Sequence, residues 1–156
     1  MDLNSSKLIR IKIMDYLAIR DHSKKELVKK MVNKVDSIEL LQEEINKLES
    51  QGYINEERFG EEYIRARILR GYGPIRIKSE LRTRGLKDDT ISTSLSNYDK
   101  AWPSIAIKAL NKKFTTGNES NDDLKLLLKK KRFLAYRGFS FEQIDQAIKQ
   151  QNFNGF

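Results

Sequence analysis

Hydrophobic residues recur every three or four positions along most of this chain, the spacing that places them on one face of an α-helix. No segment alternates hydrophobic and polar residues as a half-buried β-strand would. The helical spacing is carried by Ile38, Leu41, Ile45 and Leu48; by Phe59, Tyr63 and Ala66; by Ile77 and Leu81; by Ile91 and Leu95; and by Ile144 and Ile148. The pattern predicts an all-α protein built from short amphipathic helices.

Helix-capping residues and helix-ending glycines predict where these helices begin and end. Glycine adopts the left-handed conformation that ends a helix, and a hydrophobic residue after it packs back onto the last turn. Three segments have this form: 51–53 (QGY), 84–86 (RGL) and 137–139 (RGF). Predicted starts are the capping boxes Ser23–Glu26, Asp36–Glu39 and Ser140–Gln143, the caps Asn55 and Asp88, and Pro74 at a first helical position. The polar stretch 115–123 (TTGNESNDD) predicts a loop.

The helical segments also resemble one another. The stop at Gly85 is followed by Ile91 and the stop at Gly138 by Ile144, at the same interval. The segments before these stops, SELRTRG and RFLAYRG, are similar, and YLAIRDHSKKEL near the start resembles FLAYRGFSFEQI near the end. The similarity predicts a degenerate array of about three units, each too small to bury its hydrophobic face alone.

Few residues offer catalytic or metal-binding chemistry. The chain has no cysteine and one histidine, which excludes thiolate chemistry and a histidine-rich metal site. His22 precedes the predicted cap Ser23, and we expect a surface or capping role for it. The segment from Gly71 to Lys78 does not form a phosphate-binding loop, because Ile77 stands where glycine is needed before the lysine. We expect no catalytic residue, no cofactor and no metal.

The sequence also bears on location. No hydrophobic run approaches the ~18 residues that span a bilayer, and charges interrupt the apolar stretch near the N-terminus, unlike in a signal peptide. The absence of cysteine suits a reducing cytosol. These features predict a soluble, cytoplasmic protein without a membrane partner.

Positive charge is concentrated in the second part of the chain. The net charge is +8. Residues 1–60 hold 11 basic and 11 acidic side chains, whereas residues 61–156 hold 19 basic and 11 acidic ones. Between Tyr63 and Lys87 the only acidic residue is Glu80, against eight basic ones. Such a surface favours a polyanion or an acidic protein partner, and the alternative is an ordinary solvated helix face.

Arginine dominates this basic segment, and its planar guanidinium suits phosphate or carboxylate better than lysine does. A second basic run, 129–132, wraps around its helix and fits the solvated alternative equally well. Tyr72 either stacks on a nucleic-acid base or packs against its own repeat, and packing is the favoured interpretation. The candidate binding residues are Arg65, Arg67, Arg70, Tyr72, Arg76, Lys78, Arg82 and Arg84, with Lys130 and Arg132 from the second run. Among these, we expect Arg67 and Arg76 to brace the fold instead.

The same residues carry a resemblance to a known family. Residues 59–67 (FGEEYIRAR), 71–77 (GYGPIRI), 80–81 (EL) and 84–86 (RGL) resemble the central signature of the RecX regulatory proteins. The flanks resemble the two ends of that family through Tyr16-Leu17, Arg20, Ser23 and Glu26-Leu27, and through Arg132–Leu134, Arg137–Ser140 and Ile144. One departure is Asn33-Lys34-Val35, where the family usually has a glycine turn. Asparagine tolerates the left-handed conformation, so we expect the turn to survive.

The resemblance implies an all-α fold of three tandem three-helix repeats, forming an elongated, curved array. The expected repeats span residues 1–54, 55–100 (central and basic) and 101–156. RecX-like proteins bind the RecA–DNA filament and lower its recombinase, ATPase and co-protease activity, by blocking extension or promoting disassembly, in DNA repair and the SOS response. The resemblance thus implies a non-enzymatic regulator with RecA as its partner. We expect a monomer that binds single-stranded or duplex DNA weakly and without sequence preference.

Two other classes of function remain open at this level. A helix-turn-helix regulator would place the helix after Pro74 in the major groove, and would predict a dimer on a palindromic site. A small metal-dependent nuclease would use acidic pairs such as Glu56-Glu57 and Glu61-Glu62, although nothing in the sequence converges with them. Acidic residues early in a helix also have an ordinary explanation in the helix dipole.

Overall fold

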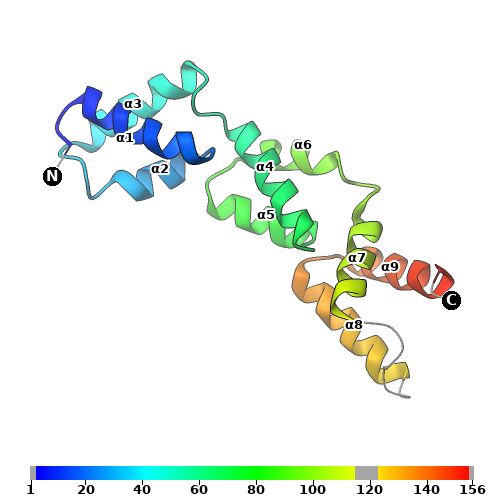
Figure 1. Cartoon of the computed structure of the whole chain (residues 1–156). Helices are drawn as coiled ribbons and strands as arrows, with labels where there is room; N and C mark the ends of the chain where they lie inside the picture. The colour runs from blue at the N-terminus through cyan, green and yellow to red at the C-terminus, as the bar shows by residue number, and fades with distance from the viewer. Residues whose placement is uncertain (1–2, 115–122, 155–156) are drawn as a thin grey trace. The chain divides into compact units, whose positions relative to one another are not determined.

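The computed structural model describes residues 3–114 and 123–154, and within them the chain is all-α (Figure 1). Helices succeed one another through short connections, and the described residues form no strand beyond an isolated bridge between Leu3 and Val35. The helices are α1 (Ser6–Ile19), α2 (Lys24–Met31), α3 (Ile38–Ser50), α4 (Glu56–Leu69), α5 (Pro74–Thr83), α6 (Asp88–Ser96), α7 (Trp102–Lys113), α8 (Asp123–Arg137) and α9 (Phe141–Asn154). The predicted fold class is confirmed. Of the loop predicted at 115–123, all but Asp123 lies outside the described residues, and Asp123 begins α8.

The described chain forms two compact units. Unit 1 comprises Met1–Glu62 with Leu81–Ile91, and unit 2 comprises Tyr63–Glu80 with Ser92–Phe156. The divisions fall inside α4, α5 and α6. The helices of the central repeat therefore contribute residues to both units.

The core of unit 1 is formed by the apolar faces of its first three helices, with α3 packed against α1 and α2. Its fully or almost fully buried members are Ile9, Ile13, Leu27, Met31, Leu41, Ile45, Leu48 and Ile54. The segment after α2 is held by Leu3, whose N–H donates to the Lys34 carbonyl at 2.7 Å and whose carbonyl accepts from the Asp36 N–H at 3.0 Å.

The expectation of a left-handed Asn33 is wrong. No non-glycine residue in the described part of the chain has a positive φ. The turn after α2 survives because backbone pairing with Leu3 closes it, so asparagine needs no unusual conformation there.

In unit 2, α7 packs against both α8 and α9. Trp102, 2% exposed, lies at the start of α7 and meets the Phe139 ring edge-on at 6.4 Å. Other buried members of this unit are Ile64, Ile77, Ala106, Ala109, Leu110, Leu134, Ile144, Ala147 and Ile148. The tryptophan is thus a natural reporter of folding in unit 2.

Most predicted helix starts are confirmed. The Ser23 Oγ accepts from the Glu26 N–H at 3.1 Å while the Ser23 N–H donates to the Glu26 carboxylate at 3.1 Å. The same reciprocal pair joins Ser140 and Gln143 at the start of α9. The Asn55 Oδ1 accepts from the N–H of Arg58 at 3.0 Å, which caps α4.

Two predicted caps are displaced by one residue. Ser37 rather than Asp36 caps α3, with its side chain accepting from the Leu40 N–H. Asp88 is the first residue of α6, and its carboxylate accepts from Arg82 at 2.7 Å. A helix start offers several neighbouring donors, so sequence spacing alone does not select between adjacent polar residues.

The three predicted stop glycines, Gly52, Gly85 and Gly138, all have positive φ, between 85° and 97°. A fourth, Gly71 at the end of α4, has a φ of 82° and was not predicted as a stop.

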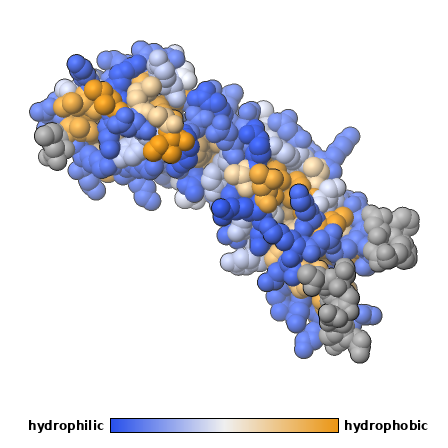
Figure 2. Space-filling view, in the orientation of Figure 1, coloured by the Kyte–Doolittle hydropathy of each residue, from blue (hydrophilic) through white to orange (hydrophobic). Residues whose placement is uncertain are grey.

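Hydrophobic residues come to the surface in separate patches on a largely hydrophilic exterior (Figure 2). Among the residues with described positions, no helix combines the length and apolar character that a membrane span requires.

Candidate interaction site

The turn between α4 and α5 is the focus of the basic segment, and it is built around one aromatic ring. Guanidinium carbons of Arg67, Arg76 and Arg137 lie 3.8, 4.5 and 4.7 Å from the centre of the Tyr72 ring. Cations at such distances interact favourably with an aromatic π-face. The half-buried Tyr72 therefore packs within its own unit, and three arginines surround its ring.

One carboxylate offsets part of the positive charge of this cluster. Glu80 accepts from Arg67 through both oxygens at 2.9 and 2.8 Å, from the Tyr63 hydroxyl at 3.0 Å and from Arg76 at 3.4 Å. Burial acts to raise the pKa of Glu80, but the hydrogen bonds from Arg67 and Tyr63 outweigh it and hold the pKa below its ordinary value. Glu80, the single acidic residue of the basic segment, thus anchors Arg67 and Arg76 within the fold.

The same turn is a joint between α5 and the α8–α9 connection. The Gly73 N–H donates to the Arg137 carbonyl at 2.8 Å, and the Ile75 N–H donates to the Gly138 carbonyl at 2.9 Å. A Cβ on Gly73 would lie 2.5 Å from the Gly138 oxygen, which no side chain tolerates. The Arg137 guanidinium closes the joint by donating to the Arg70 carbonyl at 2.6 Å. Glycine at 73 and 138 is therefore required by backbone contact.

Unit 1 contains an equivalent joint, at the start of α2. The Ser23 hydroxyl donates to the Arg84 carbonyl at 2.6 Å, and a Cβ on Gly85 would lie 2.7 Å from the Lys25 Cβ. The Arg84 guanidinium donates to Glu26 at 3.2 Å. In both units, an Arg-Gly turn thus packs against the start of a helix that lies about sixty residues earlier in the sequence. The internal sequence similarity reflects this repeated contact.

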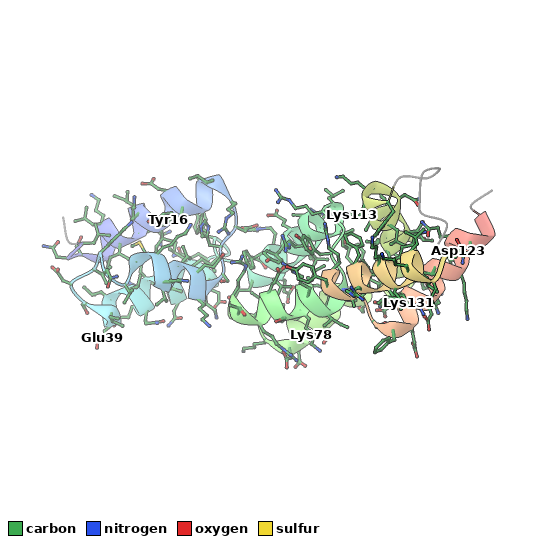
Figure 3. The ribbon with its side chains drawn as sticks, turned by 90° about the horizontal axis from the view of Figure 1, so that it is seen from below. Tyr16, Glu39, Lys78, Lys113, Asp123 and Lys131 are labelled. Carbon is green, nitrogen blue, oxygen red and sulfur yellow. The ribbon has the colours of Figure 1, made fainter. Side chains whose placement is uncertain are left out.

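The other candidate residues fall into two groups. Arg82 pairs with Asp88, Arg84 with Glu26, and Lys130 donates to Gln151 at 3.1 Å. Four of the candidate cations form no ion pair within the described part of the chain: Arg65, Arg70, Lys78 and Arg132. Figure 3 shows the side chain of Lys78 on α5. Their uncompensated charge makes these four the most available to an external anion.

His22 lies elsewhere than the sequence suggested. His22 is only 2% exposed, so the surface role expected for it is wrong. The Nδ1 lies 3.0 Å from the Arg20 carbonyl and the Nε2 lies 2.7 Å from the Lys30 Nζ. Burial lowers the pKa of His22, which favours the neutral ring that accepts from Lys30.

Acidic pairs do not assemble into a metal site. Within the ranges that the structure describes, no group of three or more His, Cys, Asp or Glu side chains is placed to hold an ion. Glu56 instead accepts from the Lys24 N–H at 3.0 Å. The described side chains around the basic turn are therefore suited to pairing with anions and to contact with another protein.

Comparison with known proteins agrees with this arrangement. The family model described as "RecX, second three-helix domain" matches residues 55–95, and that described as "RecX, third three-helix domain" matches residues 104–148. "Regulatory protein RecX" of Pseudomonas entomophila (strain L48) is 34% identical over 94% of this chain and 93% of its own length. The protein of the same name from Legionella pneumophila (strain Corby) is 35% identical over 86% of this chain and 88% of its own length.

A solved structure shares the fold. The crystal structure of RecX from Lactobacillus salivarius superposes with a TM-score of 0.80 at 24% identity, over 95% of this chain and 97% of that one. This structure supports the fold, and the family models with the relatives of 34–35% identity show the family. This chain belongs to the RecX family of regulatory proteins.

Proposed function

We propose that this protein binds the RecA filament on DNA and restrains it, without catalysis of its own. The observation that carries the proposal is the family membership, with identity to regulatory proteins over nearly the whole chain. We further propose that the protein acts in the cytoplasm as a monomer, in DNA repair and the SOS response, through repeats spanning residues 1–54, 55–100 and 101–156.

The proposed contact surface consists of ten residues from the second repeat and α8: Arg65, Arg67, Arg70, Tyr72, Arg76, Lys78, Arg82, Arg84, Lys130 and Arg132. Within it, Arg65, Arg70, Lys78 and Arg132 contribute most, because no carboxylate among the described residues neutralises them. Arg67 and Arg76 contribute mainly by bracing the turn around Tyr72. Binding to DNA alone is weak and salt-sensitive in this proposal, since displaced counterions supply most of the free energy.

The α5 environment counts against the helix-turn-helix alternative. Recognition helices read bases mainly through their N-terminal residues. At the start of α5, Gly73 and Ile75 donate backbone hydrogen bonds to the Arg137–Gly138 turn, and Arg76 lies against Gly138. This end of the helix is therefore occupied by protein.

The test is the DNA-dependent ATPase rate of the cognate RecA as the protein is titrated in. Inhibition well below one copy per RecA supports filament control by capping or triggered disassembly. The double variant Arg65→Ala/Lys78→Ala should inhibit more weakly, whereas the control Lys7→Ala/Lys29→Ala, which removes two exposed lysines of unit 1, should inhibit like the wild type. No inhibition at excess protein, on filaments verified by electron microscopy, refutes the proposal. A sequence-specific duplex footprint would support the helix-turn-helix alternative.

A further inference from the structure

A groove on unit 2 has an apolar floor and a cationic rim. It lies between the end of α4, one face of α7 and the C-terminal part of α8, and its volume is about 230 Å³. The floor is formed by Ile68, Leu69, Ile105 and Phe133. Leu69 is 73% exposed, so its side chain is accessible to a partner. The groove therefore offers apolar contact to a bulky side chain of a partner.

The spacing of residues along α7 explains why the groove has both apolar and cationic lining. Ile105, Lys108, Ala109 and Lys112 are spaced by three or four residues, so they share one face of the helix. The neighbouring face carries Trp102, Ala106 and Leu110 into the core, and Ala109 is also buried. Because Gly71 has no side chain, the turn after α4 approaches the Ala109 methyl so closely that an added Cβ would lie 3.1 Å from it. The small residues thus bring the apolar floor next to the lysines.

All the charged residues that line the groove are positive: Arg70, Lys108, Lys112, Lys113 and Arg137. None of these five is paired with a carboxylate among the residues whose positions the structure describes. Figure 3 shows Lys113 and Lys78 at separate places on unit 2, the first at the end of α7 and the second on α5. The groove is therefore a cationic site centred away from α5, and it shares only Arg70 with the surface that we assigned to the filament.

The aromatic floor argues for a peptide rather than a nucleic-acid strand. Binding of single strands relies on bases stacking on exposed aromatic faces. The Phe133 ring is engaged by the Arg137 guanidinium at 4.9 Å and meets the Phe114 ring edge-on at 5.7 Å. What remains accessible is aliphatic surface, which suits an apolar side chain of a peptide. The surrounding lysines suit carboxylates on either side of that side chain.

We propose that this groove binds an acidic peptide segment of a protein partner, with one bulky apolar side chain seated between Leu69 and α7 and with carboxylates paired to Lys108 and Lys112. The proposal does not rest on filament binding. It concerns a separate surface, and its test contains neither RecA nor DNA.

The test is fluorescence anisotropy of the labelled peptide DEDEFDEDE with the full chain. The double variant Lys108→Gln/Lys112→Gln should weaken binding roughly two- to twentyfold, as expected for the loss of two solvent-exposed ion pairs. Leu69→Ser should weaken it about fivefold or more through lost apolar contact. The control Lys7→Gln/Lys29→Gln makes the same change in net charge on unit 1 and should bind like the wild type. Unchanged Trp102 emission shows that each variant keeps the fold of unit 2.

Three outcomes overturn the proposal. The first is equal weakening by the control pair, which would mean that net charge alone attracts the peptide. The second is equal binding of the peptide DEDESDEDE, which would mean that the apolar floor is not used. The third is that a thymidine oligonucleotide of equal charge displaces the peptide, binds more tightly than the peptide does, and loses affinity for the Leu69→Ser variant. That result would assign the groove to nucleic acid.

Discussion

Glu80 is the residue whose replacement tests the construction of the basic turn most directly. Glu80→Gln keeps the size of the side chain and removes its charge. The guanidinium groups of Arg67 and Arg76 would then lose their single carboxylate partner while remaining close to Arg137 around the Tyr72 ring. No carboxylate would then offset the repulsion among these three cations.

The expected cost follows from exposure. The side chains of Glu80, Arg67 and Arg76 are 24%, 19% and 31% exposed. Breaking a fully buried ion pair costs about 3–5 kcal/mol, and an exposed pair contributes about 0.2–1 kcal/mol. A partly exposed carboxylate with several donors lies between these limits, so we expect a loss of about 2 kcal/mol in the free energy of unfolding. For a chain of this length that corresponds to about 4–8 °C in the melting temperature.

The assay is urea unfolding followed through Trp102, because this buried tryptophan and Glu80 belong to the same unit. The matched control is Asp145→Asn, which removes an exposed carboxylate of unit 2 that lies 3.8 Å from Lys131. The control should lose about 0.5 kcal/mol or less. Equal losses in the two variants would refute the bracing role of Glu80.

The pH dependence gives a second check on Glu80. Its pKa is held below the ordinary value of 4.5, so the carboxylate stabilises the folded state fully above that pH. The advantage of the wild type over Glu80→Gln should be lost as pH falls below 4.5 and through the folded-state pKa. An advantage that persists after Glu80 is protonated would mean that shape, not charge, is responsible.

Three further predictions concern stability, each measured by urea unfolding. Gly52 and Gly138 both have positive φ, but only a Cβ at 138 would collide with backbone atoms. Gly52→Ala should therefore cost about 1 kcal/mol in the free energy of unfolding and Gly138→Ala should cost more. Equal losses would contradict the tight joint at Gly138. Ser23→Ala should cost about 1–2 kcal/mol, because Ser23 caps α2 and also donates across the joint. Ser5→Ala, which removes only the cap of α1, should cost less, and similar losses would argue against the second bond of Ser23. Burial lowers the pKa of His22 in the folded state, so as pH falls below 6.5 the histidine is protonated first in the unfolded state. The free energy of unfolding should therefore fall by at most about 1.4 kcal/mol per pH unit. His22→Gln should flatten this slope, and an unchanged slope would assign it to another group.

Local signals in the sequence predicted the helices well for a physical reason. A cap, a stop glycine and an amphipathic face all depend on residues within about four positions of one another. Ser23 with Glu26 and Ser140 with Gln143 therefore formed the predicted capping boxes. The same locality limits precision, as the displaced cap from Asp36 to Ser37 shows.

Partners that are distant in sequence were not predictable in this way. Nothing near Ser23 indicates that its hydroxyl will donate to the carbonyl of Arg84, which lies 61 residues later in the sequence. The repeated Arg-Gly sequences suggested a structural repeat. Only the structure shows that each turn seats against the start of an earlier helix.

The sequence by itself determined the all-α class, the helix ends, the repeat and the concentration of positive charge after residue 60, since all of these are properties of local pattern and composition. The tertiary structure decided what each basic residue does with its charge. Arg67 and Arg76 are engaged by Glu80 and Tyr72, whereas Arg65 and Lys78 have no such partner in the described chain. Arg65 and Arg67 differ in this way although both lie on α4, because the fold brings Glu80 of another helix, α5, within hydrogen-bonding distance of Arg67.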